Sequence, residues 1–149
     1  MSLIDKISES IKIAMREKDS IKLESLRAIK SSLLLSLTEK GKKGELSQSE
    51  EIKILQKLVK QRKDSAEIYK TQNRNELAEL EIKQSIFIEE FLPDQISEDE
   101  LKKMIQSIIN QIGASGMKDM GKVMGIASKQ LLGKADGKTI SSMVKNLLN

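Results

Sequence analysis

The sequence contains no histidine, cysteine or tryptophan. Without cysteine there is no disulfide and no thiolate zinc site, and without histidine the chain lacks the commonest general base and metal ligand. Serine, lysine and carboxylates remain, so catalysis would need an unusual arrangement of these groups. We therefore expect no catalytic residue, no metal site and no cofactor. Two phenylalanines and one tyrosine are too few to build a stacking platform for single-stranded nucleic acid.

Long hydrophobic runs are also missing. Apolar clusters such as Leu33–Leu35 are only a few residues long, whereas a helix that crosses a bilayer needs roughly 20 apolar residues. Charged residues begin at position five, which is not typical of a secretory signal. The sequence thus favours a soluble, cytoplasmic protein with no membrane partner. The formal net charge of +4 permits an anionic partner without requiring one.

The remaining pattern is helical throughout. Proline occurs once, and no segment alternates apolar and polar residues as a half-buried strand would. Apolar residues instead recur at steps of three and four, as they do along one face of a helix. The predicted fold class is therefore all-α. The spacing predicts seven helices, which cover about residues 2–17, 19–39, 47–70, 76–92, 97–112, 118–132 and 137–148.

Several helix ends carry recognisable signals. The stretches "SQSE" at 47–50 and "SEDE" at 97–100 have the capping-box pattern, in which a serine and a carboxylate satisfy each other's backbone donors. Pro93 ends the fourth helix because proline cannot donate to the helix ladder. The third and fourth helices are expected to form a long antiparallel hairpin. Pro93 and the second capping box also indicate a boundary, between an N-terminal helical domain of residues 1–94 and a three-helix tail domain of residues 95–149.

Two glycine-containing stretches come close to a phosphate-binding loop, whose pattern is G-x-x-x-x-G-K followed by Ser or Thr. The first, "GMKDMGKV" at 116–123, ends in Val123, and the second, "GKADGKT" at 133–139, has three residues between its glycines where four are required. A working loop of this kind also follows a strand, and none is predicted. We interpret the glycines as helix stops and turns. Gly121 and Gly125, four residues apart, are expected to allow the close approach of two helices.

Lysines dominate the charge of the same region, since the C-terminal quarter of the chain holds six lysines and two aspartates. Lys118, Lys122 and Lys129 are spaced so that they share the helix face opposite the apolar stripe. Lys134 and Lys138 flank the turn that follows. A charged face is often no more than a solvated face, but here the charge has one sign and lies beside helix N-termini, which also attract anions. The pattern suits a phosphate backbone, which can be held without aromatic readout.

Four stretches of the sequence resemble a known family. They are "LQKLVKQRKDSAEIY" at 55–69, "FLPDQISEDEL" at 91–101, "GASGMKDMGKVMG" at 113–125 and "GKADGKTISSMVKNLL" at 133–148. Together they resemble the YqeY family, and the C-terminal stretches also resemble the tail domain of GatB, the B subunit of the glutamine-dependent tRNA amidotransferase. The resemblance extends over essentially the whole chain. It implies an all-helical protein with an N-terminal helical part and a small three-helix tail.

The resemblance also implies a function. In GatB the tail helps to hold the tRNA while amide transfer takes place elsewhere, and this chain lacks both the catalytic cradle of GatB and the amidase subunit. We predict a non-catalytic module that binds tRNA or another structured RNA. The phosphate contacts are assigned to Lys118, Lys122, Lys129, Lys134 and Lys138, and the positions of close backbone approach to Gly116, Gly121, Gly125 and Gly137.

Two alternatives stay open at this point. One is a protein-interaction adaptor that docks on an amidotransferase or a synthetase. The other is an enzyme of amide transfer, because YqeY proteins are described as carbon–nitrogen ligases with glutamine as the amido donor. That description looks inherited from GatB.

Overall fold

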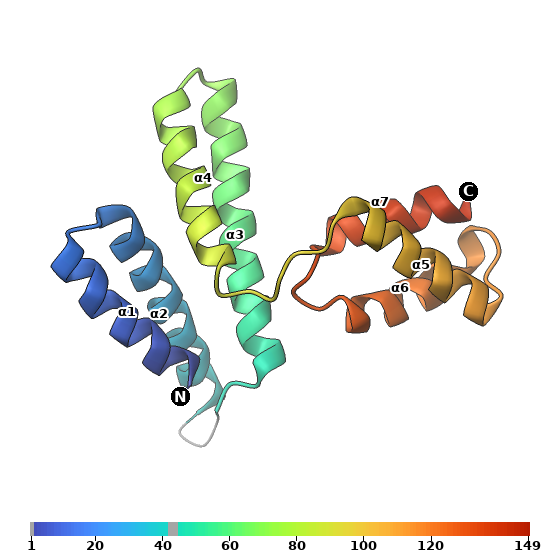
Figure 1. Cartoon of the computed structure of the whole chain (residues 1–149), viewed down its shortest axis with the longest axis horizontal. Coiled ribbons are helices and arrows are strands. Elements are labelled where there is room, and N and C mark those ends of the chain that lie inside the picture. The colour runs from blue at the N-terminus through green and yellow to red at the C-terminus, as the bar shows by residue number, and fades with distance from the viewer. Residues whose placement is uncertain (1, 42–44) are drawn as a thin grey trace. The chain divides into compact units, whose positions relative to one another are not determined.

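The computed structural model describes residues 2–41 and 45–149. Within these residues there are seven α-helices, one short 3₁₀ turn and no strand, so the prediction of an all-α fold is confirmed. None of these helices is long and apolar enough to cross a membrane. The elements are α1 (Leu3–Glu17), α2 (Ser20–Lys40), α3 (Gln48–Thr71), α4 (Asn75–Glu89), α5 (Glu98–Ile112), η1 (Met117–Asp119), α6 (Met120–Gln130) and α7 (Gly137–Leu148) (Figure 1).

The helix starts show which capping signals are realised. At α3 both bonds of the predicted capping box form: Ser47 Oγ accepts from the Glu50 N–H at 3.2 Å, and Glu50 Oε2 accepts from the Ser47 N–H at 2.8 Å. At α5 only half of the box forms within the described residues, since Ser97 Oγ accepts from the Glu100 N–H at 3.2 Å and no return bond is made. The second capping box is therefore corrected to a single serine cap.

The chain divides into two compact units, Met1–Leu92 and Pro93–Asn149. In the first unit α1 and α2 form one hairpin, α3 and α4 form a longer one, and α2 packs against both helices of the longer hairpin (Figure 1). Leu26, Ile29 and Leu33 of α2 are almost completely buried there. They share one core cluster with Leu55 and Ile88, so α2 provides the central layer of this unit.

The second unit is built from α5, α6 and α7, each of which contacts the other two. Its core consists of Leu101, Ile105, Ile108, Ile109, Val123, Ala127, Leu131, Ile140, Val144 and Leu148. Two hydrogen bonds close one end: the Ile96 N–H donates to the Lys134 carbonyl at 2.9 Å, and Gln95 Nε2 donates to the Gly133 carbonyl at 2.7 Å. These bonds bring the start of α5 to the connection between α6 and α7.

Candidate nucleic-acid interface

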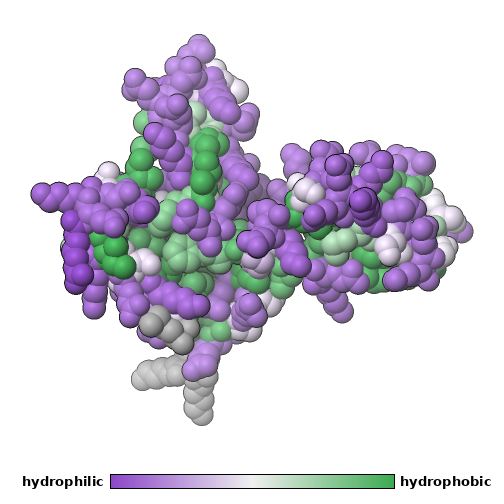
Figure 2. All heavy atoms as spheres, in the orientation of Figure 1, coloured by the Kyte–Doolittle hydropathy of each residue, from purple (hydrophilic) through white to green (hydrophobic). Residues whose placement is uncertain are grey.

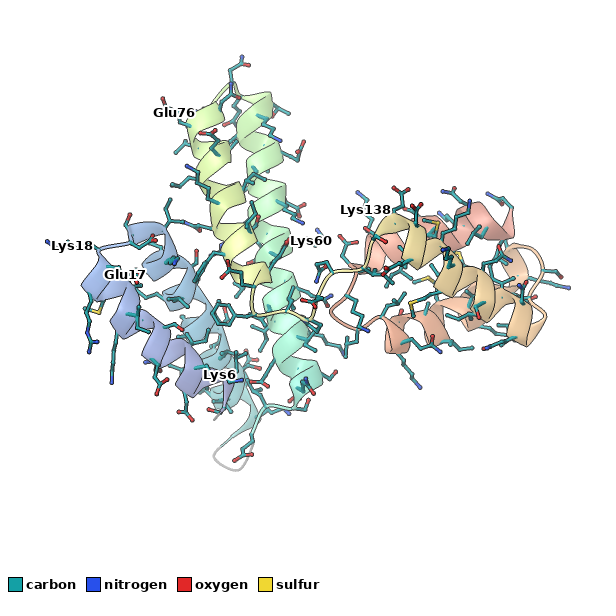
Figure 3. The ribbon with its side chains drawn as sticks, in the orientation of Figure 1. Lys6, Glu17, Lys18, Lys60, Glu76 and Lys138 are labelled. Carbon is teal, nitrogen blue, oxygen red and sulfur yellow. The ribbon has the colours of Figure 1, made fainter. Side chains whose placement is uncertain are left out.

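The five lysines assigned to phosphate contacts all lie in the second unit, and all are exposed. Lys118 belongs to the 3₁₀ turn η1, and Lys122 and Lys129 belong to α6. Lys134 lies between α6 and α7, while Lys138 is in the first turn of α7 (Figure 3). Each ammonium group therefore faces solvent from a position on or next to a short helical element.

The local structure of α6 explains why its lysines face outward. Val123 and Ala127 are four residues apart, are fully buried and point into the core of the unit. Lys122 and Lys129 are seven residues apart, which places them on one side of the helix, away from that buried pair. The apolar spacing of the helix thus fixes the charged face as well as the buried face.

The glycines on α6 do not play the role that their spacing suggested. Gly121 and Gly125 are both exposed, and a Cβ added at either position would meet nothing within 4 Å. The prediction of close helix–helix approach at these glycines is therefore wrong, because they lie on the lysine side of α6 and not on the side that α5 and α7 cover. Gly116 and Gly137 likewise border open space. Close approach of an outside ligand to these four positions stays a prediction.

The two helix starts of this region differ in their electrostatics. Asp136 caps α7, since its Oδ1 accepts from the Thr139 N–H at 2.7 Å, and its carboxylate lies at the positive end of that helix. Asp119 precedes α6 but accepts from the Ser115 N–H at 2.9 Å instead of capping α6. No side chain caps η1 or α6 within the described residues. The start of α6 thus keeps more of its positive end than the start of α7 does.

The five lysines do not form one uniform cluster. Lys118 and Lys122 lie at the N-terminal end of α6, whereas Lys129 and Lys134 lie at or beyond its last turn. The helix between them has 11 residues, which corresponds to about 16 Å. The bonds from Gln95 to Gly133 and from Ile96 to Lys134 also place the acidic first turn of α5, residues 98–100, at the Lys134 end. No local pattern in the sequence indicates this juxtaposition.

Carboxylates elsewhere in the described chain form ion pairs instead of a metal or catalytic cluster. Lys60 Nζ lies 2.7 Å from Asp64 Oδ2, and Lys70 Nζ lies 3.5 Å from Glu67 Oε1, all four side chains being largely exposed. No group of three His, Cys, Asp or Glu side chains that could hold a metal ion is found among these residues. The charged surface of α6 therefore remains the strongest candidate for a functional site.

Comparison with known proteins places this architecture. The family model of Yqey-like proteins matches residues 4–148. The chain belongs to the YqeY family. The match covers both units, so it includes the long hairpin as well as the lysine-bearing helices.

Two curated proteins are similar to this YqeY-family chain. Altered inheritance of mitochondria protein 41, mitochondrial, from Clavispora lusitaniae is 30% identical over 132 residues, which cover 87% of this chain and 74% of that protein. A glutamyl-tRNA(Gln) amidotransferase subunit from Thermococcus gammatolerans is 41% identical over 54 residues. That match covers 34% of this chain and only 9% of the archaeal polypeptide, so it relates a segment and not the whole of either protein.

Proposed function

We propose that this protein is a non-catalytic RNA-binding module, which holds tRNA or another structured RNA through the lysine face of its second unit. The observation that carries the proposal is the run of exposed lysines along η1 and α6, Lys118, Lys122 and Lys129, backed by a buried apolar face. The partial similarity to a polypeptide named for glutamyl-tRNA(Gln) supports tRNA as the first RNA to test.

The chemistry of the face determines how it would read RNA. Lysine is a compact point charge on a flexible stem, suited to phosphate and indifferent to base identity. No exposed aromatic ring lies in the second unit, because the chain's three aromatic residues all precede Pro93. Recognition would therefore follow the shape and charge of a folded RNA backbone. The uncapped start of α6 would add backbone N–H donors to the Lys118–Lys122 end.

The test is binding of the full-length protein to unmodified tRNA, measured by fluorescence anisotropy over a range of salt concentrations. We expect log affinity to fall linearly with log salt, and Lys118→Ala/Lys122→Ala to reduce the magnitude of that slope by about 1 to 2. The matched control is Lys102→Ala/Lys103→Ala, which removes two exposed lysines of α5. Absence of tRNA binding at low salt, or equal slopes for the two double variants, would overturn the proposal.

A second candidate function is a protein-interaction adaptor, with an amidotransferase or a synthetase as the partner to test. The observation that favours it is the exposure of Leu77 and Leu80 in the first unit, 41% and 40%. As for location, we propose the cytoplasm from the sequence, whereas the relative from Clavispora lusitaniae carries a mitochondrial name. Cell fractionation with an antibody to the protein distinguishes the two compartments.

A further inference from the structure

One side of α4 carries an apolar stripe that the rest of the first unit covers only in part. The stripe consists of Leu77, Leu80, Gln84, Phe87 and Phe91, at helical steps of three and four. Phe87 and Phe91 pack into the core edge to face, with ring centroids 5.8 Å apart. Leu77 and Leu80 are 41% and 40% exposed. The stripe is thus buried at one end of the helix and open at the other.

The limit of the covered part is set by α2. Lys22 Nζ lies 5.7 Å from the centroid of the Phe87 ring, and Glu24 Oε2 accepts from Gln84 Nε2 at 3.1 Å. Both partners are near the start of α2, so α2 does not extend beyond Gln84 toward the hairpin turn. Figure 1 shows the same relationship, because the α3–α4 hairpin continues well past the connection between α1 and α2.

The adjacent helix α3 contributes one more residue to the open end. Arg62 Nε donates to Gln84 Oε1 at 3.2 Å, which marks the same limit on α3. Tyr69 follows Arg62 by seven residues and therefore lies on the same side of α3, about two turns closer to the hairpin turn. Its side chain is half-buried. Tyr69, Leu77 and Leu80 are called here the uncovered face.

Carboxylates surround the uncovered face. Between residues 64 and 81 the chain has five carboxylates against Lys70 and Arg74. Glu76, Glu79 and Glu81 flank the two leucines on α4, and none of them forms an ion pair with another described residue. Figure 3 shows Glu76 near the tip of the hairpin, and Figure 2 shows hydrophobic surface on the hairpin beside hydrophilic residues. The face is therefore apolar with an acidic border.

This combination of charge and shape selects the kind of partner. An acidic border repels nucleic acid and anionic membranes. A second copy would bring the same carboxylates against each other, and like charges across an interface are costly. What covers the other half of the stripe is itself a helix, α2. A helix of opposite charge complements both the apolar centre and the acidic border.

We propose that the uncovered face is a docking site for a basic amphipathic helix of a partner protein. The apolar side of that helix packs on Tyr69, Leu77 and Leu80, continuing the layer that α2 begins. Its lysine or arginine residues pair with Glu76 and Glu79. The site lies in the first unit and does not depend on RNA binding by α6. Because the face is small, its complexes are weak and exchange rapidly.

The probe is a synthetic peptide of about 18 residues, long enough for several helical turns, with leucine at the a and d heptad positions, lysine at most others, and no aromatic residue. A control peptide has glutamate in place of lysine. Tyr69 is the chain's single tyrosine and there is no tryptophan, so the intrinsic fluorescence of the full-length protein reports on this face. We expect the basic peptide to bind at low salt with micromolar affinity and to change the Tyr69 emission, and the acidic peptide not to bind.

Matched variants locate the contact. Leu77→Ser/Leu80→Ser is expected to weaken binding of the basic peptide by about tenfold or more, since apolar anchors dominate small interfaces. Ile86→Ser is the control: Ile86 is 58% exposed on the same helix but nine residues from Leu77, which places it on the opposite side of α4. It should leave the affinity unchanged. Circular dichroism melting of each variant checks that the fold is kept.

Several results would overturn the docking site. They are no binding of the basic peptide at high micromolar concentration, equal affinity for the acidic peptide, and equal affinity of the Leu77→Ser/Leu80→Ser protein. A dimer in sedimentation equilibrium that this double variant dissociates would assign the face to a second copy instead. Lys118→Ala/Lys122→Ala should keep peptide binding, and Leu77→Ser/Leu80→Ser should keep tRNA binding, so failure of one proposal is distinguishable from failure of the other.

Discussion

Arg62 and Gln84 join the two helices of the long hairpin through a hydrogen bond of 3.2 Å from Arg62 Nε to Gln84 Oε1. Arg62 also donates to the Leu58 carbonyl at 3.1 Å, and Gln84 Nε2 donates to Glu24 Oε2 at 3.1 Å. One buried amide, 9% exposed, thus connects α3, α4 and α2. It also divides the covered part of the α4 stripe from the open part.

The first prediction concerns this amide. Gln84→Leu keeps a side chain of similar size but leaves the Arg62 Nε–H and Glu24 without their partner. We expect a loss of about 1 to 3 kcal/mol in the free energy of unfolding, the usual cost of an unsatisfied buried polar group. Urea unfolding followed by tyrosine fluorescence measures it. Gln61→Leu, at an exposed position of α3, should change stability by less than about 0.5 kcal/mol; equal effects of the two changes would contradict the assignment.

The second prediction is a pH dependence at the start of α3. The hydrogen bond from Lys40, and then the bond from the Ser47 backbone, lower the pKa of the Glu50 carboxyl. A lowered folded-state pKa stabilises the fold above the unfolded value of about 4.3, and this contribution is lost as the pH falls through the folded value. Glu50→Gln should therefore destabilise the protein at pH 7 but not in strong acid.

Unfolding free energies of the Glu50→Gln and wild-type proteins, measured from neutral pH down to strong acid, check this expectation. Glu67→Gln is the control, because Glu67 pairs with Lys70 at 3.5 Å on an exposed surface and caps no helix. A stability difference for Glu50→Gln that persists unchanged below the lowered pKa would show that its origin is not the carboxylate charge.

The third prediction separates the roles of the α6 glycines. Gly121 and Gly125 lie inside a helix beside open space, so Gly121→Ala and Gly125→Ala should each stabilise the protein by about 0.5 to 1 kcal/mol. If these positions also touch a phosphate backbone, tRNA affinity falls while stability rises. Gly113→Ala is the contrast: Gly113 ends α5 with φ +65°, and alanine is strained there. Thermal melting and tRNA binding of the three variants give the answer.

The fourth prediction ranks the two ends of the lysine face. Lys134→Ala/Lys138→Ala should reduce the salt dependence of tRNA binding less than Lys118→Ala/Lys122→Ala does. The reason is that the acidic first turn of α5 lies at the Lys134 end, whereas the start of α6 keeps its uncapped positive end. Anisotropy titrations of both double variants against the same tRNA measure the difference. The reverse ranking would place the RNA at the other end of α6.

Local sequence signals were sufficient for most of the fold. Each helix has its own apolar period, and caps such as Ser47 and stops such as Gly113 act within one turn, so the elements could be predicted one by one. What the sequence could not show is where one helix outlasts its neighbour. Leu77 and Leu80 have the spacing of core residues, yet they are exposed because α2 begins opposite Gln84.

The candidate site divides in the same way. The exposure of Lys122 follows from the burial of Val123, its neighbour in sequence. The place of Lys134 beside the acidic turn depends on a backbone bond to Ile96, far away along the chain. The glycines of α6 were assigned to the wrong face for a related reason, since a spacing of four residues identifies a face without showing which face a neighbouring helix will cover.

The closure of the second unit has a consequence for its evolutionary history. Its buried core residues all fall between Leu101 and Leu148, and the bonds that fasten its ends begin at Gln95. A stretch that contains its own core and fastens its own beginning can be joined to another gene without redesign of either product. The same small appendage can then accompany quite different polypeptides, each of which gains the basic surface together with the fold that presents it.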